Sequence, residues 1–205
     1  MNNKLEQQSV PTKKEERGGF LFDALEMFVW SLAILLLLFT FVLRLCRVDG
    51  SSMENTLFHG ENLLLYSFLY EPEQDDIIVF HLTGEDNGLE KMLVKRVIAT
   101  GGQTVNIDFQ NNTITVDGEI YKDEHAVLKN SSDMIVDRYL NLRPNWNYDA
   151  QNDTMTVTVP EGHLFVLGDN RNFSRDSRDE SIMFVDERCV LGKVILRLSP
   201  FTVFS

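Results

Sequence analysis

The first residues in the chain that could carry out chemistry are a glycine and two serines, Gly50-Ser51-Ser52. A glycine beside a serine lets the backbone turn sharply and leaves an amide N–H near a hydroxyl. That arrangement suits a nucleophile with an oxyanion hole. The same residues are also typical of a flexible linker, and taken alone they do not decide between the two interpretations.

A serine nucleophile needs a base, and histidine and lysine are the two options. The chain has four histidines, His59, His81, His125 and His163. None lies in the sequence context of a catalytic triad. Lys95 lies in the apolar run Leu93–Ala99, where burial would lower the pKa of its amine and let it take a proton from Ser52. Strand alternation places Lys95 and Arg96 on opposite faces, and either face could be the buried one.

A third segment, Gly168–Arg178, gathers two Asp, two Asn, three Arg and two Ser in eleven residues. Such a composition is compatible with a solvated loop. The segment directly follows the apolar run His163–Leu167, however, so it begins at the rim of a core. Its Asp and Arg side chains could form ion pairs within a hydrogen-bonded network, leaving a Ser free to orient a neighbour.

The elements that must position these residues are mostly strands, because everything after Val48 is predicted to form one β-rich domain. Eight short runs rich in β-branched, aromatic or Leu residues are predicted strands: Asn62–Tyr66, Ile77–Phe80, Leu93–Ala99, Thr104–Phe109, Thr113–Val116, Thr154–Val159, His163–Leu167 and Val190–Leu198. Asp117-Gly118 marks a hairpin within Thr113–Tyr121. The polar stretch 123–150 is interpreted as an insertion of unassigned structure.

An uncharged run of seventeen residues, Met27–Leu43, precedes this domain. As a helix it would span about 26 Å, close to the thickness of the bilayer hydrocarbon. Because Arg44 can snorkel, the predicted membrane helix covers 26–46. No small-x-small cleavage site follows it, which argues against a removed signal peptide. Residues 1–25 are predicted to be a disordered tail, and the flanking basic residues slightly favour an inner N-terminus.

Composition excludes several classes of protein. Of 205 residues, 43% are hydrophobic, which is incompatible with wholesale disorder. A formal net charge of -12 argues against a protein that binds nucleic acid through phosphate contacts. The two cysteines, Cys46 and Cys189, cannot form a disulfide framework and have no metal-ligand spacing. We therefore expect free thiols. A reaction carried out by Ser52 and Lys95 would need no metal and no organic cofactor.

Together the three segments resemble the characteristic boxes of type I signal peptidases, which are membrane-anchored Ser–Lys endopeptidases. Gly50–Leu57 matches the pattern Gly-x-Ser-Met-x-Pro-Thr-Leu at all fixed positions but one. Lys95–Val97 matches the Lys-Arg-Val that opens the lysine box. Gly168–Arg178 matches Gly-Asp-Asn-Arg-x-x-Ser-x-Asp-Ser-Arg at every fixed position. The boxes appear in family order, just after a membrane helix, and the resemblance covers residues 25 to 200. The Gly-x-Ser form and the single helix resemble the Gram-positive branch.

The chain also departs from the family pattern. Asn55 replaces the usual Pro after the nucleophile, and Asp75 replaces the Gly before the box Asp76–Phe80. The residues after Val97 lack the usual Gly-x-Pro-Gly-Asp and read Ile-Ala-Thr-Gly-Gly-Gln. These changes affect loop shape and remove no catalytic group.

The resemblance implies a role for each matched residue. Ser52 would be the nucleophile, Lys95 the general base, and Ser174 would orient the Lys95 amine. Asp176 and Arg178 would form a supporting ion pair. The Ser52 backbone N–H would contribute to the oxyanion hole, and Met53 would wall the substrate groove.

The resemblance also implies a fold, a substrate and a location. The fold would be the mainly β fold shared with LexA-like repressors, preceded by one N-terminal transmembrane helix. The enzyme would remove signal peptides from secretory preproteins, cleaving after small residues at positions -1 and -3. It would be a single-pass plasma-membrane protein with a cytoplasmic N-terminus and an extracytoplasmic domain, 47–205. Its partners would be signal peptides and the lipid bilayer, without nucleic acid, and it would be monomeric.

Two rival hypotheses use the same residues. One is a self-cleaving, repressor-like protease, for which the expected N-terminal DNA-binding module is missing. The other is an inactive, membrane-tethered binding or assembly domain. Incubation with a preprotein, followed by N-terminal sequencing of the product, separates all three.

Overall fold

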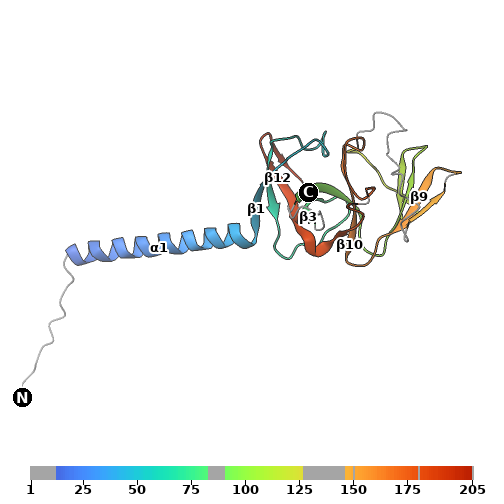
Figure 1. Ribbon diagram of the computed structural model, residues 1–205. Helices are drawn as coiled ribbons and strands as arrows, with labels where there is room; N and C mark the ends of the chain where they lie inside the picture. The colour runs from blue at the N-terminus through green and yellow to red at the C-terminus, as the bar shows by residue number, and fades with distance from the viewer. Residues whose placement is uncertain (1–12, 83–90, 127–145, 150, 180, 205) are drawn as a thin grey trace, which may run out of the picture. The chain divides into compact units, whose positions relative to one another are not determined.

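The computed structural model describes residues 13–82, 91–126, 146–149, 151–179 and 181–204 (Figure 1). The chain divides into two compact units, Met1–Val42 and Leu43–Ser205. The first contains the long N-terminal helix and the second is built from strands.

Helix α1 runs from Lys13 to Phe41, and its part Phe22–Phe41 is long and apolar enough to cross a membrane. These 20 residues would span about 30 Å at about 1.5 Å per residue. None of the span is buried inside the protein. The hydroxyls of Ser31 and Thr40 donate to backbone carbonyls of the helix itself, at 2.8 and 2.6 Å. Such internal bonds suit a helix whose surroundings offer no water.

Two sequence predictions about the N-terminal region need correction. The helix was expected to continue to residue 46, but it ends at Phe41, and Leu43–Arg47 forms strand β1. The physical reason is pairing: β1 lies antiparallel to β2, Asn62–Tyr66, in a register that runs from Leu43 opposite Tyr66 to Arg47 opposite Asn62. The tail 1–25 was expected to be disordered, but residues 13–25 are helical, and residues 1–12 lie outside the described residues.

The larger sheet has eight strands and carries the lysine box. In addition to β1 and β2 it contains β3 (Ile77–Leu82), β4 (Lys91–Ala99), β10 (His163–Leu167), β11 (Val185–Asp186), β12 (Val190–Leu198) and β13 (Phe201–Val203). The order is β1-β2-β12-β3-β4-β10-β11, with β13 paired to β12, and the pairings are antiparallel. A short 3-10 helix, Glu187–Cys189, connects β11 to β12.

The smaller sheet has five strands in the order β7-β6-β5-β9-β8. They are β5 (Thr104–Asp108), β6 (Thr113–Val116), β7 (Glu119–Ile120), β8 (Trp146–Asp149) and β9 (Thr154–Thr158). The predicted hairpin around Asp117-Gly118 is confirmed, because Val116 pairs with Glu119. Within the predicted insertion 123–150, residues 146–149 form β8 against β9, while 127–145 and 150 lie outside the described residues.

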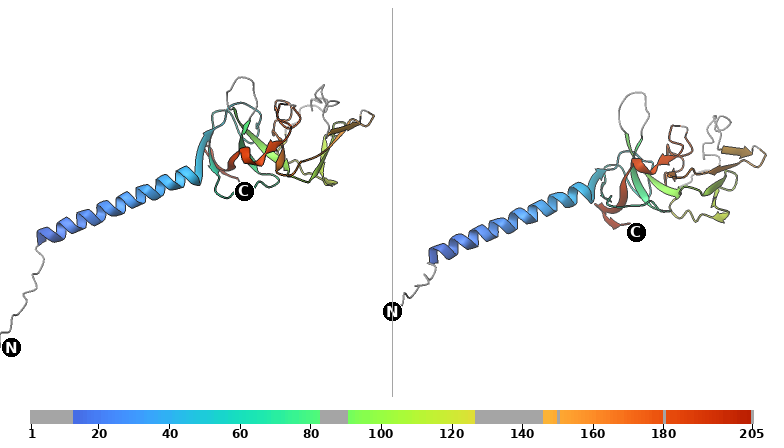
Figure 2. Two further views of the ribbon diagram at one scale, coloured as in Figure 1. Left: turned by 60° about the horizontal axis from the view of Figure 1, so that its bottom comes forward. Right: turned by 90° about the horizontal axis from the view of Figure 1, so that it is seen from below.

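The predicted mainly β architecture is confirmed, and Figure 2 shows the strands of the domain from two further sides. Buried apolar side chains join the two sheets. Ile98 and Ala99 of β4 and Phe165 of β10 share one buried cluster with Val105 and Met155 of the smaller sheet. β4 thus passes through the middle of the domain with both faces covered, which is why its side chains near residue 95 are buried in both directions.

Candidate active site

The side chains of Ser52 and Lys95, 43 residues apart in sequence, meet in the folded domain. The Lys95 Nζ lies 2.8 Å from the Ser52 Oγ, and it also donates to the Val94 carbonyl at 2.9 Å. Lys95 projects from β4 and is only 2% exposed, whereas Ser52 lies in the turn after β1. A buried amine in contact with a serine hydroxyl is the geometry needed for proton transfer between them.

The environment of Lys95 favours an uncharged amine. Burial lowers the pKa of Lys95 from 10.5 to about 8, because the ammonium form loses its hydration. Asp176 opposes this change, and the positive charge of Arg175 adds to it. Near pH 8 about half of the molecules therefore hold a neutral amine that can accept a proton.

A turn fixed on both sides holds Ser52 in place. Met53 and Leu57 are buried in the cluster between β2, β3 and β12, and the Leu57 N–H donates to the Met53 carbonyl at 2.8 Å. From the other side, the Asn170 N–H donates to the Ser52 carbonyl at 3.0 Å, and the Asn170 side chain donates to the Ser51 carbonyl at 3.1 Å. The polar segment after β10 therefore clamps the backbone of the nucleophile turn.

The Ser52 backbone N–H is free to face a substrate. No described residue accepts a hydrogen bond from it. Gly50, two residues earlier, has a φ of +102°, in the region that favours glycine. An unpaired N–H beside the nucleophile can donate to the oxyanion that forms when the hydroxyl attacks a carbonyl.

Ser174 lies beside this turn, packed against Gly168. A Cβ at position 168 would overlap the Ser174 Oγ and would lie 2.5 Å from the Ser52 carbonyl oxygen. The Ser174 hydroxyl is buried, and its hydrogen bond to the Asp176 carboxylate helps to lower the pKa of that group. The Lys95 amine bonds to Ser52 and Val94, and the bond from Ser174 to Lys95 that the resemblance implies stays a prediction. The amine has hydrogen-bonding capacity beyond these two partners.

We expect Gly168→Ala to lower activity about 100-fold, because the added methyl group must displace Ser174 and the Ser52 backbone. The measurement is the cleavage rate of a preprotein, with thermal unfolding recorded in parallel. Gly118→Asn is the matched control, since residue 118 has open space around it and Asn tolerates its φ of +85°. An unchanged kcat in the Gly168→Ala variant would refute the close packing of this site.

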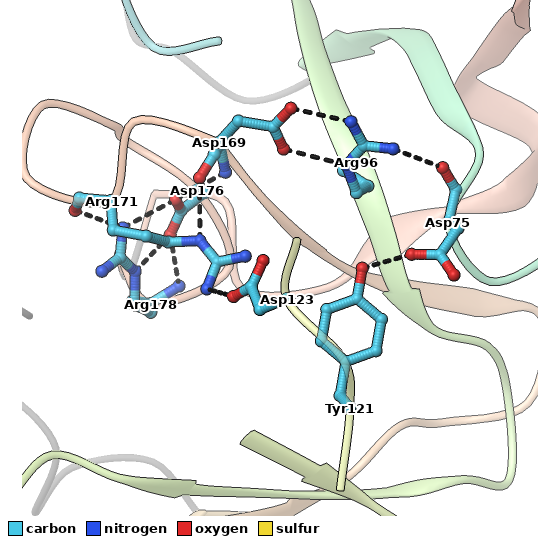
Figure 3. Close-up of polar contacts among 9 residues, drawn as sticks. Asp75, Arg96, Tyr121, Asp123, Asp169, Arg171, Asp176 and Arg178 are labelled. Carbon is cyan, nitrogen blue, oxygen red and sulfur yellow. Dashed lines mark hydrogen bonds and ion pairs between the residues drawn. The ribbon is translucent and has the colours of Figure 1, made fainter. Parts of the chain in front are cut away.

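Asp176 and Arg178 form the ion pair that the resemblance implies (Figure 3). The Arg178 Nε and Nη2 donate to the two carboxylate oxygens of Asp176 at 2.8 and 2.9 Å, and the Gly168 N–H donates to the same carboxylate at 3.0 Å. Burial alone would raise the pKa of Asp176, yet Arg178 holds it below its usual range. Arg178 also donates to the Arg171 carbonyl at 2.8 Å, so the pair locks the loop after β10 into shape.

A second buried ion pair links the strand of Lys95 to the nucleophile turn, and sequence reasoning missed it. Arg96 donates to both carboxylate oxygens of Asp169, at 2.9 and 2.8 Å, and to the Asp75 carbonyl at 2.8 Å. Asp169 accepts a further bond from the Thr56 hydroxyl. The Tyr121 hydroxyl donates to the Asp75 carboxylate, which ties the segment after β7 to the same network (Figure 3).

A cavity of about 260 Å³ opens beside the two reactive side chains. Its lining includes Ser52, Lys95, Met53 and Met92. Cys46 also lines the cavity, but burial raises the pKa of its thiol to about 11, which leaves it protonated at neutral pH. Cys46 and Cys189 are both free thiols.

The cavity runs along an open strand edge. β3 pairs with β4 over Lys91–Arg96, whereas β10 pairs with β4 only over Arg96–Ala99. On that side, Met92–Lys95 has no strand partner within the described parts of the chain. An extended peptide could add a strand there and reach Ser52.

In the described parts of the chain, no three His, Cys, Asp or Glu side chains gather as a metal site.

The chain is similar over most of its length to proteins of one known family. A family model described as signal peptidase, peptidase S26, matches residues 21–199. The chain is 31% identical over 188 residues to a probable signal peptidase I-1 of Synechocystis sp., covering 88% of this chain and 84% of that protein. It is 29% identical over 177 residues to signal peptidase IB of Staphylococcus aureus, covering 84% and 86%. A crystal structure of a signal peptidase I from Enterococcus faecalis V583 matches with a TM-score of 0.40 and 27% identity, covering 61% of this chain and 97% of that one.

Proposed function

This chain belongs to the signal peptidase family, peptidase S26, and on that premise we propose that it removes signal peptides from secretory preproteins with Ser52 as nucleophile and Lys95 as general base. One observation carries the assignment of the dyad: the amine of Lys95, a residue only 2% exposed, lies 2.8 Å from the Ser52 hydroxyl, and both residues line one cavity. Among the residues that line this cavity, Ser52 is the only serine and Lys95 the only lysine.

Each step of the reaction has a group to perform it. The Ser52 Oγ attacks the scissile carbonyl while the neutral Lys95 amine takes the hydroxyl proton. The Ser52 N–H donates to the oxyanion of the tetrahedral intermediate. The Lys95 ammonium then gives its proton to the leaving amine, which leaves an acyl-enzyme on Ser52. Finally Lys95 takes a proton from water, the resulting hydroxide attacks the ester carbonyl, and the same proton returns to Ser52 as it leaves.

Ser174 would act on Lys95 and not on the substrate. Its buried hydroxyl lies next to the Ser52 backbone and bonds to the Asp176 carboxylate. A small movement would let it accept a hydrogen bond from the amine. That bond would hold the lone pair of Lys95 toward the Ser52 hydroxyl.

The proposed specificity for small residues at -1 and -3 follows from the open edge of β4. A peptide bound there as an added strand turns alternate side chains to the same face. Side chains at -1 and -3 would therefore both enter the cavity of about 260 Å³, which Met53 and Met92 help to line. Large side chains at both positions would exceed that space.

Helix α1 would anchor the enzyme in the plasma membrane, with the N-terminus in the cytoplasm and the β domain outside. The span Phe22–Phe41 has the required length, and the tether would confine enzyme and inserted preprotein to the same surface. Ser52 and Lys95 come from one chain, so a single copy is sufficient for catalysis.

The test is incubation of the purified enzyme with a preprotein in detergent or vesicles, followed by N-terminal sequencing of the product. The proposal predicts one new N-terminus, directly after a small residue that has a second small residue two positions before it. Cleavage of the enzyme itself without preprotein cleavage would indicate the repressor-like alternative. Binding without any cleavage would indicate an inactive tethered domain.

A further inference from the structure

His59, which the dyad does not use, touches the backbone two residues before the nucleophile. Its Nδ1 accepts a hydrogen bond from the Gly50 N–H at 3.2 Å. The same Nδ1 lies 3.3 Å from the Asp49 Oδ1. One ring nitrogen therefore faces a hydrogen-bond donor and a negatively charged acceptor at almost equal distances.

The hydrogen bond between Gly50 and His59 is the last in a short series of hydrogen bonds that leads toward Ser52. The Val48 N–H donates to the Glu61 carbonyl at 2.9 Å, and the Gly60 N–H donates to the Val48 carbonyl at 2.9 Å. The Gly50–His59 bond extends this series to the glycine whose φ of +102° sets the turn. Beyond it, Asp49 and Ser52 line the cavity. The glycine that His59 holds therefore lies two residues before the nucleophile, at the start of the same turn.

A ring nitrogen either accepts a hydrogen bond or carries a proton, and it cannot do both. In neutral His59 with its proton on Nε2, Nδ1 accepts from Gly50. In protonated His59, Nδ1 becomes a donor and bonds to the Asp49 carboxylate instead. The Gly50 N–H then has no acceptor on the ring. Imidazole is the side chain that makes this change in mildly acidic solution.

The other charged groups around His59 are engaged elsewhere. Arg47 donates to the Gly60 carbonyl at 3.1 Å. Glu61 accepts from the Phe58 N–H at 3.0 Å and pairs with Arg197 at 3.3 Å. Asp49 is thus the carboxylate that competes with Gly50 for Nδ1.

We propose that His59 is a positioning residue for the nucleophile turn, and that its protonation releases Gly50 and lowers turnover in acid independently of Lys95. The inference rests on the proposed function, because it is read out through preprotein cleavage. It adds a second ionisation, from a residue outside the dyad, to the pH dependence of the enzyme.

The test compares kcat/KM of wild type and His59→Asn from pH 5 to 9 on one preprotein. The Asn Oδ1 is as many bonds from Cα as the His Nδ1, so it can accept from Gly50, and it does not titrate. Lys95 affects both enzymes equally, so the ratio of wild type to His59→Asn isolates His59. We expect a kcat/KM ratio near 1 at pH 8 to 9. As the pH decreases, the ratio should fall about 2- to 10-fold, which corresponds to the net contribution of one hydrogen bond.

His163→Asn is the matched control, because His163 also has Nδ1 beside a backbone oxygen, that of Glu161 at 3.0 Å, but belongs to β10, opposite Asp186 of β11, and not to the nucleophile turn. Its ratio should stay flat. In Asp49→Asn the protonated ring loses its carboxylate partner, so the loss of kcat/KM that we attribute to His59 should occur at a lower pH than in wild type. This variant tests the inference even if His59→Asn folds poorly. The inference would be overturned if the kcat/KM ratio for His59→Asn did not change with pH, or if the loss of kcat/KM in Asp49→Asn occurred at the same pH as in wild type. Absence of cleavage by wild type would instead overturn the proposed function.

Discussion

Ser52→Ala is expected to reduce preprotein cleavage by about 10⁴-fold or more, because Ser52 is the hydroxyl that contacts Lys95 and the only serine among the residues that line the cavity. The Ser52 side chain is half-buried and bonds to Lys95, so the fold should survive its loss. Cleavage assays with and without preprotein, together with thermal unfolding, measure both effects.

Ser51→Ala is the control for this prediction. Ser51 has the same side chain one residue earlier, and its backbone carbonyl, which the substitution keeps, accepts from Asn170. We expect Ser51→Ala to retain most activity. The opposite pattern, with an active Ser52→Ala and an inactive Ser51→Ala, would move the nucleophile to Ser51.

Replacement of Lys95 is expected to abolish cleavage while making the fold more stable. Lys95→Met removes the base and should match the loss seen for Ser52→Ala. Lys95→Arg should be equally inactive, because a guanidinium stays charged and cannot accept the Ser52 proton. Lys122→Met, which replaces an exposed lysine, should leave the rate unchanged.

The gain in stability follows from the sign of the pKa change. The unfolded chain holds the Lys95 proton up to about 10.5, whereas the folded chain releases it near 8, so folding at pH 7 carries the cost of a buried ammonium. That cost is about 3 kcal/mol and disappears as the pH rises through 10.5. At pH 7, Lys95→Met should unfold at a higher temperature than wild type, and the difference should shrink at alkaline pH. A lower unfolding temperature at pH 7 would show that Lys95 is not buried as described.

Local sequence patterns predicted the bounds of a strand correctly where turn residues border it on both sides. Asn62–Tyr66, His163–Leu167 and Val190–Leu198 have the predicted bounds. The helix end was wrong because Leu43, Leu45 and Cys46 continue the apolar character of the span before them. Only the pairing of Leu43–Arg47 with a strand about twenty residues later makes it β1.

The site was predictable only in part, for a similar reason. Box patterns pointed to Ser52, Lys95, Asp176 and Arg178, but alternation along β4 could not place Lys95, because both faces of that strand are buried. The Thr56–Asp169 bond joins residues 113 positions apart, and nothing near either residue indicates it. Such contacts depend on how the sheets pack, which no local pattern encodes.

An NMR titration of the enzyme with ¹³Cε-labelled lysine tests the central claim most directly. One lysine resonance, absent from the spectrum of Lys95→Met, should titrate with a midpoint near pH 8 while exposed lysines titrate near 10.5. A spectrum in which the resonance lost in Lys95→Met also titrates near 10.5 would mean that the amine is charged at working pH and cannot be the base.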